Sequence, residues 1–304
     1  MKRKDLLGIK DLSKSELNEI LQSANAMRET IDRRERLTTL AGKQIATLFF
    51  ENSTRTRNSF DMAAKKTGAQ STGMSASTSS VQKGETLIDT GKTLDAIGFD
   101  AIVIRHPASG APRVLAENVK ASVVNAGDGM NEHPTQALLD VLTAKRHFGD
   151  IAGLKIVIVG DIKHSRVARS DVLAFTKLGA EVTVCAPYTL MPVGFDGMGA
   201  KVETDFDKAI EGANVVMALR LQLERMDQAY FPSIAEYHKY YGVTSKRMLR
   251  AADDAVIMHP APINRGAEVS GEAADGENSL IYEQPTNGVA VRMAVLDYLL
   301  GGAK

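Results

Sequence analysis

The chain has 304 residues, of which 37 are basic and 37 are acidic, so its formal net charge is zero. A neutral balance argues against a broad electrostatic surface for nucleic acid or for a membrane. The composition is 44% hydrophobic and 24% charged, and no uncharged apolar run approaches the roughly 18 residues that a membrane-spanning helix needs. The length is that of about two globular domains.

Targeting and redox signals are few. The N-terminus, from Met1 to Asp5, is basic but leads into only a short apolar stretch, which does not fit a signal peptide. The single cysteine, Cys185, stands in an apolar run and is expected in a core, so neither a disulfide nor a cysteine zinc site can be built. We therefore predict a reducing, cytoplasmic setting.

Helix and strand signals alternate through the first half of the chain. Ser13 and Glu16 have the spacing of a capping box and predict the start of a helix. After this helix we expect, in order, a strand over 44–50, a helix from about 55, a Ser/Thr-rich loop through 80, a helix over about 85–97, a strand over 101–104, a helical segment around 114–119, a strand over 122–124 and a long helix from Pro134 to about Phe148. The last of these is the candidate connector between domains.

Apolar runs typical of buried parallel strands recur in the second half, with helical segments between them. They cover 154–160, 182–185, 215–218 and 255–258, and a final helical pattern covers about 288–300. We therefore predict an α/β protein with two doubly wound parallel-sheet domains joined by interdomain helices. The predicted parts are a first domain over 1–149, which includes the connecting helix 134–149, a second domain over 150–285, and a C-terminal helix over 286–304 that packs back on the first domain.

The pentapeptide Ser53-Thr54-Arg55-Thr56-Arg57 follows the first apolar run and begins a helix. The first turn of a helix offers unpaired N–H groups and a positive dipole end, and here hydroxyls and a guanidinium join them. The pattern predicts a phosphate site with Ser53 at the N-cap and Ser53 to Thr56 facing the anion. Arg57, one position further around the helix, is expected to make a structural ion pair. An ordinary capped helix with exposed arginines fits the same residues.

No nucleotide-binding motif accompanies this phosphate signal. The turn after the run 154–160 reads Gly160-Asp161-Ile162-Lys163-His164-Ser165-Arg166, with one glycine where a dinucleotide fold needs G-x-G-x-x-G. The chain also lacks a P-loop motif. An NAD-binding dehydrogenase is therefore a weak alternative, although the turn does place Arg166 at the start of a helix.

Polar residues also follow the predicted strands 101–104 and 122–124. Arg105 ends the first strand, and His133 and Gln136 lie in the first turn of the connector helix. An imidazole there can donate to a carbonyl oxygen, and an amide oxygen can accept an N–H. A lone histidine at this position could equally be a packing residue.

Three further segments stand near helix starts or strand ends. Arg220-Leu221-Gln222 follows one strand and His259-Pro260-Ala261-Pro262 another, where the X-Pro bonds force extended backbone that presents carbonyl oxygens. Lys83, beside Gly84, precedes a helix and could reach a ligand, although an isolated lysine is ordinarily solvated surface.

The chain resembles the aspartate/ornithine transcarbamoylase family in three motifs that occur in the right order over nearly its whole length: Ser53-Thr54-Arg55-Thr56-Arg57, His133-Pro134-Thr135-Gln136 and His259-Pro260-Ala261-Pro262. Three further segments are similar to the aspartate branch of the family, namely Lys83-Gly84-Glu85-Thr86, Gly160-Asp161 with Arg166, and Arg220-Leu221-Gln222. The ornithine branch would have a cysteine where Ala261 stands and an Asp-x-x-Ser-Met-Gly segment, which this chain lacks.

The resemblance implies transfer of the carbamoyl group of carbamoyl phosphate to the α-amino group of L-aspartate, which gives N-carbamoyl-L-aspartate and phosphate for pyrimidine synthesis. It implies no metal and no organic cofactor, and an active site in a cleft between the two domains. The implied ligands of carbamoyl phosphate are Ser53, Thr54, Arg55, Thr56, Arg105, His133, Gln136, Ala261 and Pro262. The implied ligands of aspartate are Lys83, Arg166, Arg220 and Gln222.

By the same resemblance, five of these residues are catalytic: Arg55, Thr56, Arg105, His133 and Gln136. Thr56, Arg105 and His133 would contact the carbonyl oxygen, whereas Gln136 and the backbone carbonyl of Pro262 would accept from the carbamoyl NH₂. Lys83, with Ser79, would be lent by a neighbour in a homotrimer with shared sites. Glu51, with Arg166 and Arg225, is similar to the bridge between the family's domains, and hinges are expected near 133–150 and 285–290.

Three alternatives remain. One is a transcarbamoylase for another amine acceptor, such as ornithine or an unusual amino acid, of which ornithine is disfavoured because its cationic δ-amine would not seek this many arginines. A non-catalytic subunit that keeps the fold is disfavoured because every implied site residue is present, and a dehydrogenase fails at Gly160. The sequence leaves open whether regulatory chains or a dihydroorotase bind the trimer.

Overall fold

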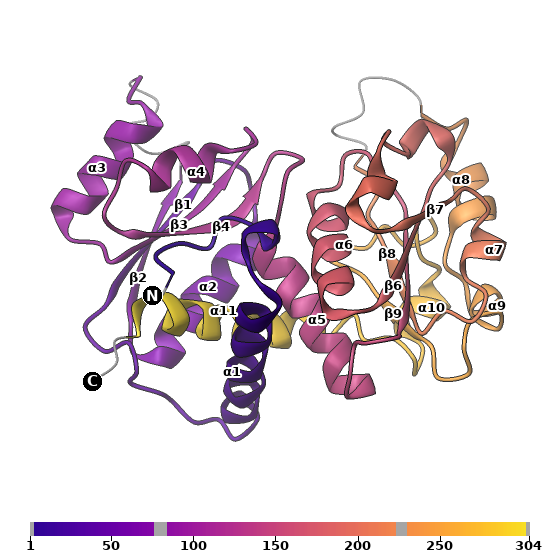
Figure 1. Ribbon diagram of the computed structural model, residues 1–304, viewed down its shortest axis with the longest axis horizontal. Helices are drawn as coiled ribbons and strands as arrows, with labels where there is room; N and C mark the ends of the chain where they lie inside the picture. Colours follow the sequence, from indigo (N-terminus) through magenta and orange to yellow (C-terminus); the bar gives the residue numbers. More distant parts are fainter. Residues whose placement is uncertain (1–2, 76–83, 223–229, 302–304) are drawn as a thin grey trace. The chain divides into compact units, whose positions relative to one another are not determined.

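The computed structural model describes residues 3–75, 84–222 and 230–301. The chain divides into two compact units, one made of Met1–Leu142 and Pro285–Lys304 and the other of Thr143–Gln284. Each unit is built on one parallel β-sheet with helices around it (Figure 1). The predicted fold class, two α/β domains with parallel sheets, is confirmed.

Among the described residues, the first unit contains four strands and most of the longer helices. Its elements are a 3₁₀ turn at Ile9–Asp11, α1 (Lys14–Asp32), β1 (Gln44–Phe49), α2 (Thr54–Thr67), β2 (Gln70–Ser75), α3 (Leu87–Ile97), β3 (Ala101–His106), α4 (Ala111–Ala116), β4 (Ser122–Asp128), α5 (Pro134–Phe148), whose last turns fall in the second unit, and α11 (Gln284–Leu300).

The start of α1 is the capping box that the sequence predicts. The backbone N–H of Glu16 donates to Ser13 Oγ at 3.2 Å, and the backbone N–H of Ser13 donates to Glu16 Oε2 at 2.8 Å. These two bonds satisfy N–H groups that a helix start would otherwise leave unpaired. By contrast, the helix expected around 114–119 is shifted, because Gly110 in a left-handed conformation and Pro112 begin α4 earlier.

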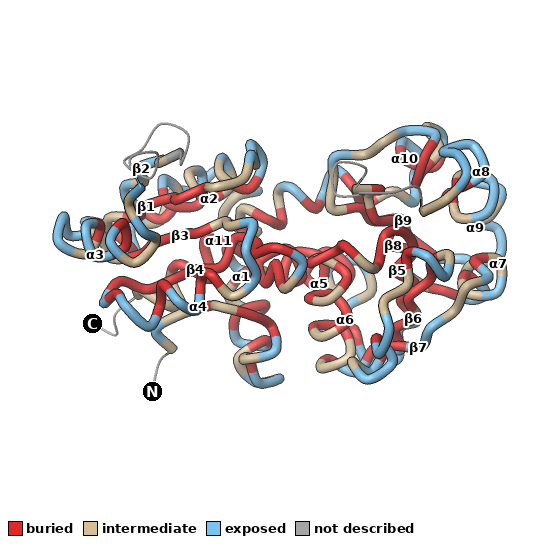
Figure 2. The backbone as a smooth tube through the Cα atoms, turned by 90° about the horizontal axis from the view of Figure 1, so that it is seen from above, coloured by how far each residue is buried: buried red, intermediate tan, exposed pale blue. Residues whose placement is uncertain are grey.

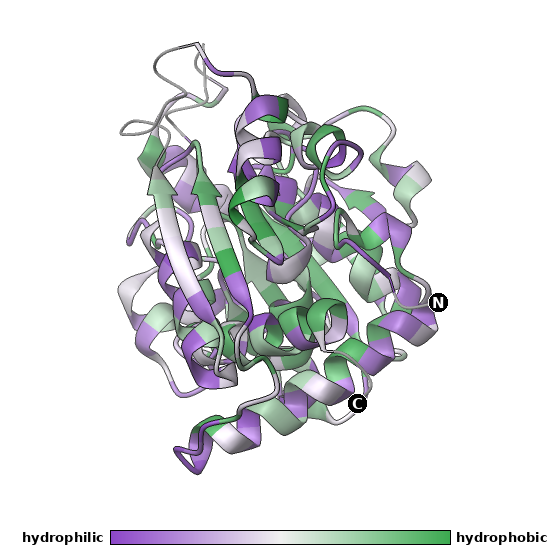
Figure 3. Ribbon diagram, turned by 90° about the vertical axis from the view of Figure 1, so that its left-hand side faces the viewer, coloured by the Kyte–Doolittle hydropathy of each residue, from purple (hydrophilic) through white to green (hydrophobic). Residues whose placement is uncertain are grey.

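The first sheet has the strand order β2-β1-β3-β4, and all its pairings are parallel. β2 occupies residues for which the sequence predicts a Ser/Thr-rich loop, so that prediction is wrong over Gln70–Ser75. The strand lies at the edge of the sheet, and it is visibly paler and more hydrophilic than its neighbour in Figure 3. Its pairing with β1, in the register Gln44 with Gln70, stabilises an extended segment that has no apolar pattern of its own.

The second unit contains a five-stranded parallel sheet and mostly short helices. Its elements are β5 (Lys155–Val159), α6 (Arg166–Leu178), β6 (Glu181–Cys185), 3₁₀ turns at Tyr188–Leu190 and Phe195–Met198, β7 (Lys201–Glu203), α7 (Phe206–Ala209), β8 (Val215–Ala218), α8 (Ile234–Tyr241), α9 (Ser245–Met248), β9 (Val256–Met258) and α10 (Gly271–Asp275). The strand order is β7-β6-β5-β8-β9, and the three-residue edge strand β7 is one that the sequence does not predict.

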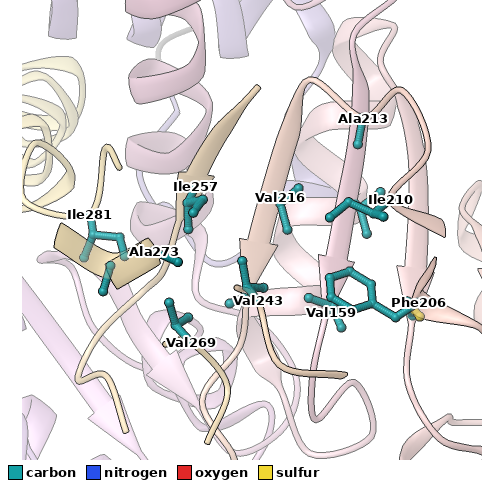
Figure 4. Close-up of a cluster of buried hydrophobic side chains, with 14 residues drawn as sticks. Val159, Phe206, Ile210, Ala213, Val216, Val243, Ile257, Val269, Ala273 and Ile281 are labelled. Carbon is teal, nitrogen blue, oxygen red and sulfur yellow. The ribbon is translucent and has the colours of Figure 1, made fainter. Parts of the chain in front are cut away.

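Each sheet has its own apolar core, and the central strands are buried along their length (Figure 2). In the first unit, residues of β1, β3 and β4 pack with Leu94 of α3 and Leu115 of α4. In the second unit, Val159, Val216 and Ile257 belong to one buried cluster with Phe206, whose ring lies beside Val159 in Figure 4. Cys185 belongs to this second core, as predicted, and burial raises the pKa of its thiol.

Candidate active site

The predicted site residues of the first unit follow three neighbouring strands of its sheet. Ser53 to Thr56 come after β1, Arg105 lies in β3, and His133 and Gln136 come after β4. The chain runs from β1 outward to β2 and then returns to β3 on the other side of β1, so β1 and β3 form a switch point. Parallel α/β sheets bind ligands outside the carboxyl ends of the strands at such a point.

Arg105 is fixed at this switch point by two neighbours. Its Nε lies 3.1 Å from Glu51 Oε2, and its Nη1 donates to Ser53 Oγ at 3.2 Å. The side chains of Arg105 and Glu51 are 16% and 22% exposed, so solvent screens this pair only in part. The structure therefore brings Ser53 and Arg105, two of the predicted site residues, together and fixes the guanidinium through contacts within the protein.

Ser53 is the residue before the first helical residue of α2, but its hydroxyl does not cap the helix. Because that hydroxyl accepts from Arg105 instead, it does not satisfy the N–H groups of the first turn. Thr54 and Arg55 on this turn are exposed, whereas Thr56 is buried. The turn has the backbone donors, hydroxyls and cation that suit a phosphate.

Arg57 takes no part in this arrangement. Its Nη2 donates to the backbone carbonyl of Met74 at 2.8 Å, and its guanidinium lies 5.4 Å from the centre of the Phe49 ring. Among the described residues, Arg57 thus has a carbonyl and a cation–π contact where the sequence predicts a structural ion pair. The role remains structural, because Arg57 ties α2 to the neighbouring strands β1 and β2.

His106 follows Arg105 in β3 and adds no second positive charge. Burial lowers the pKa of its imidazole, whose Nδ1 accepts from the backbone N–H of Ala108 at 2.9 Å. Its ring packs edge-on against Phe50 with the ring centres 4.6 Å apart. The cationic character at the end of β3 therefore belongs to Arg105.

The start of α5 buries two of the predicted residues, since His133 is 4% exposed and Gln136 is 8% exposed. The backbone N–H of Gln136 donates to the carbonyl of His133 at 2.9 Å, so the two residues share one turn. The Gln136 side chain donates from Nε2 to both carboxylate oxygens of Asp140, at 3.1 Å each. Asp140 is not among the residues predicted from the sequence, although its spacing of four residues from Gln136 on a predicted helix is a usable signal.

In the second unit the predicted residues follow β5, β8 and β9, which are again neighbours in the sheet. β5 and β8 form the switch point, with Arg166 at the first position of α6 and Arg220 and Gln222 after β8. Arg166 is only 4% exposed. Gln222 Nε2 donates to the backbone carbonyl of His164 at 3.4 Å, so the structure brings the segments of Arg166 and Gln222 together.

The loop before Arg166 is held by a buried pair. Asp161 is fully buried, and its Oδ1 accepts the backbone N–H of His164 at 3.1 Å and lies 2.9 Å from His164 Nδ1. Ser165 then caps α6, because its Oγ accepts from the N–H of Ala168 at 3.1 Å. Side-chain hydrogen bonds thus fix the turn from Gly160 to Ser165, which lacks the glycines of a dinucleotide site. The turn places Arg166 at the first position of α6.

The segment His259-Pro260-Ala261-Pro262 follows β9, and its first residue makes two hydrogen bonds that fix it. The backbone N–H of His259 donates to Gln284 Oε1 at 2.9 Å, and the N–H of Ala261 donates to His259 Nδ1 at 2.8 Å. Since Nδ1 accepts, the ring proton is assigned to Nε2, which lies 3.3 Å from the buried carboxylate of Glu268. Ala261 is held in the left-handed region with φ of 53°, and Pro262 is exposed.

Some predictions fall outside the described residues. Lys83, Ser79 and Arg225 lie there, so their predicted roles stay predictions. The bridge from Glu51 to Arg166 would join the two units and also stays a prediction, while within the first unit Glu51 pairs with Arg105.

Two negative findings concern residues 3–75, 84–222 and 230–301. None of the helices in these ranges is long and apolar enough to cross a membrane. The same ranges contain no group of three or more histidine, cysteine, aspartate or glutamate side chains placed to hold a metal ion.

Two family models match the chain in succession. Residues 4–146 match the aspartate/ornithine carbamoyltransferase carbamoyl-P binding domain, and residues 152–299 match the aspartate/ornithine carbamoyltransferase Asp/Orn binding domain. The residues at the end of β1, β3 and β4 lie in the first match, and those after β5, β8 and β9 lie in the second.

Curated relatives and solved structures agree with these matches. The aspartate carbamoyltransferase catalytic subunits of Ruminiclostridium cellulolyticum and Desulforamulus reducens are 55% and 56% identical over 301 residues, which cover 99% of this chain and 96% of each relative. The aspartate transcarbamoylase of Trypanosoma cruzi in complex with N-(phosphonacetyl)-L-aspartic acid has a TM-score of 0.90 at 31% identity, with 99% of this chain and 97% of that chain covered.

An ornithine carbamoyltransferase from Pyrococcus furiosus has a TM-score of 0.89 at 30% identity, with 99% of this chain and 98% of that chain covered. The fold is thus shared by both branches. The chain belongs to the aspartate/ornithine carbamoyltransferase family.

Proposed function

We propose that this protein is the catalytic chain of an aspartate carbamoyltransferase, which transfers the carbamoyl group of carbamoyl phosphate to the α-amino group of L-aspartate. The observation that carries the proposal is that each sheet presents cationic residues at its switch point. Arg55 and Arg105 stand there in the first unit, next to the hydroxyl of Ser53, and Arg166 and Arg220 stand there in the second. Full-length relatives more than half identical to this chain bear the aspartate name.

The first unit is proposed to bind carbamoyl phosphate. The phosphate would lie on the first turn of α2, where Ser53, Thr54, Arg55 and Thr56 offer backbone N–H groups, hydroxyls and a guanidinium. The carbonyl oxygen would take donors from Thr56, Arg105 and His133. Gln136 and the backbone carbonyl of Pro262 would accept from the carbamoyl NH₂, with Ala261 beside them.

The second unit is proposed to bind aspartate. Arg166, Arg220 and Gln222 would hold its two carboxylates, and planar guanidinium groups suit carboxylates because they can donate two parallel hydrogen bonds. Ornithine carries a cationic δ-amine, which the two arginines proposed for the acceptor site would repel. The joining of the two sets of residues into one site between the units is part of the proposal, as is closure on hinges near 133–150 and 285–290.

The reaction needs no nucleophilic side chain, because the α-amine of aspartate attacks the carbonyl carbon. A C–N bond forms, so the carbonyl carbon becomes tetrahedral and its oxygen becomes an oxyanion. The C–O bond to phosphate then breaks as the oxyanion collapses back to a carbonyl. Phosphate leaves, and the proton lost from the amine is proposed to go to the departing phosphate. Each donor to the oxyanion contributes about 3 kcal/mol to lowering the barrier, and holding the two substrates in contact contributes up to roughly 7–11 kcal/mol.

The proposed assembly is a homotrimer in which Lys83, with Ser79, completes the site of the neighbouring chain. Mixing Lys83→Ala chains with Arg55→Ala chains tests this sharing. Every trimer that contains both kinds of chain then holds one native site, so random mixing of equal amounts should restore about a quarter of the wild-type activity. Absence of rescue in trimers shown to be mixed would contradict shared sites.

The proposal leaves open whether regulatory chains or a dihydroorotase bind the trimer. We propose a cytoplasmic location, because the thiol of Cys185 is buried and forms no disulfide, which suits a reducing compartment.

The activity is tested by incubating the purified protein with carbamoyl phosphate and either L-aspartate or L-ornithine, and by following each carbamoylated product chromatographically. We expect product with aspartate and at most a trace with ornithine. Product with ornithine alone would overturn the choice of substrate. Binding of carbamoyl phosphate without any product would point instead to a non-catalytic subunit.

A further inference from the structure

The amide of Gln136 is oriented by a buried carboxylate one helical turn away. Gln136 Nε2 lies 3.1 Å from both Oδ1 and Oδ2 of Asp140, and the two residues are 8% and 0% exposed. An ionised carboxylate only accepts hydrogen bonds, so the NH₂ group of the amide must face Asp140. The amide oxygen, which only accepts, is then directed away from Asp140.

The charge of Asp140 is balanced from α11. Arg292 is 3% exposed, and this burial lowers the pKa of its guanidinium to about 10. The negative charge of Asp140 acts in the opposite direction and raises the pKa of Arg292. Arg292 therefore remains a cation at neutral pH and favours the ionised form of Asp140.

Arg292 is itself held in place by α2. Its Nη1 donates to Ser59 Oγ at 3.0 Å, and its guanidinium lies 5.2 Å from the centre of the Phe60 ring. A Cβ at Gly288 would lie 2.6 Å from Arg292 Nη1, so the absence of a side chain there makes room for the guanidinium. The orientation of the Gln136 amide thus rests on a cation fixed within the same unit.

We propose that Asp140 is a positioning residue that makes Gln136 present an acceptor, so that the site selects a carbamoyl donor by its NH₂ group. The inference rests on the proposed function, in which Gln136 contacts that NH₂. Acetyl phosphate is the informative comparison ligand, because it has a methyl group in place of the NH₂ and otherwise shares the carbonyl and phosphate. An acceptor at Gln136 favours carbamoyl phosphate and contributes nothing to acetyl phosphate.

The Asp140→Asn variant removes the constraint with almost no change of shape. The asparagine side chain can either accept from Gln136 or donate to it, so the Gln136 amide is no longer held in one orientation. When the amide turns, its NH₂ group faces the NH₂ group of carbamoyl phosphate, and two donors cannot form a hydrogen bond with each other. Loss of one hydrogen bond in a buried site corresponds to about a 10- to 100-fold weaker affinity for carbamoyl phosphate. Affinity for acetyl phosphate and for inorganic phosphate should change less than about twofold, since neither ligand has an N–H for Gln136 to accept.

The experiment measures the dissociation constants of carbamoyl phosphate, acetyl phosphate and inorganic phosphate by calorimetry for the wild type, Asp140→Asn, Gln136→Ala and the double variant. Asp140→Asn should lower the ratio of carbamoyl phosphate to acetyl phosphate affinity, and it should have no further effect in the Gln136→Ala background. Asp95→Asn is the matched control. In the wild type, the Asp95 carboxylate accepts hydrogen bonds from the backbone N–H groups of Lys120 and Ala121, which precede β4. Asp95 therefore lies at the opposite end of β4 from Gln136.

Equal weakening of all three ligands by Asp140→Asn would overturn the inference, because it would indicate a merely structural role. An unchanged affinity ratio in the folded variant would overturn it as well. If Asp140→Asn does not fold, Gln136→Ala decides alone, since an unchanged ratio there leaves Asp140 nothing to position. A wild-type protein that binds carbamoyl phosphate no better than inorganic phosphate would instead count against the proposed function.

Discussion

Arg105→Ala is expected to weaken carbamoyl phosphate binding and to slow turnover. The guanidinium is fixed in advance by Glu51 at 3.1 Å and by Ser53 at 3.2 Å, so little side-chain freedom remains to be lost when the ligand binds. Removing it deletes both a cation beside the phosphate site and a donor to the carbonyl oxygen.

The size of each effect follows from the kind of contact. A hydrogen bond from a charged donor contributes about 1.5–3 kcal/mol, which corresponds to roughly 10- to 150-fold weaker binding. A lost donor to a developing oxyanion slows the chemical step by about 10²- to 10³-fold. Arg105→Lys should fall between Arg105→Ala and the wild type, because an ammonium keeps the charge but lacks the planar fork that reaches Glu51 and Ser53 together.

The assay combines calorimetric titration with carbamoyl phosphate and initial rates of carbamoyl-aspartate formation, with thermal unfolding as the test of folding. Arg33→Ala is the matched control, since Arg33 pairs with Glu35 at 3.0 Å in a segment before β1 and is 57% exposed. It should leave binding and rate unchanged. If folded Arg105→Ala kept both quantities within about threefold of the wild type, the role assigned to the end of β3 would be refuted.

The remaining predictions concern the acceptor site, acid stability and the second core. Arg220→Ala should raise the KM for aspartate at least about 10-fold in steady-state assays while the calorimetric affinity for carbamoyl phosphate stays unchanged. Hydrogen bonds from Arg3 and Ser13 lower the pKa of Glu16 to about 2, so its stabilisation is present above the unfolded value near 4.3 and is lost as the pH falls toward 2. Glu16→Gln should therefore lower the unfolding free energy by up to about 1 kcal/mol at pH 7 and match the wild type near pH 2 in urea titrations. Phe206→Ala, at a 1% exposed core position, should lower the free energy of unfolding by about 3–5 kcal/mol in the same assay.

The parallel strands at the centre of each sheet were predictable because both of their faces are buried and their sequences are continuously apolar. Val215–Ala218 is an example, and α5 was predictable from Pro134 at its first position. The edge strands β2 and β7 were not, since one is polar and the other has three residues. Their extended form comes from pairing with a neighbour that is distant in sequence, which no local pattern reveals.

The site residues divide in the same way, into those that a local sequence pattern reveals and those that only the fold brings into place. Residues in motifs, such as Ser53 and Arg166, were named from the sequence because their types and positions at helix starts already indicate anion binding. The residues that hold them were harder to find. Glu268 is nine positions from His259 and approaches it only through the fold, whereas Asp140 was within reach of a helical spacing rule.

The most direct test of the account is a crystal structure of the protein with N-(phosphonacetyl)-L-aspartic acid, which joins a phosphonate to an aspartate. We expect the phosphonate oxygens to accept hydrogen bonds from the first turn of α2 and from Arg105, and the carboxylates to be held by Arg166 and Arg220. A phosphonate bound away from α2, or carboxylates held by other residues, would contradict it.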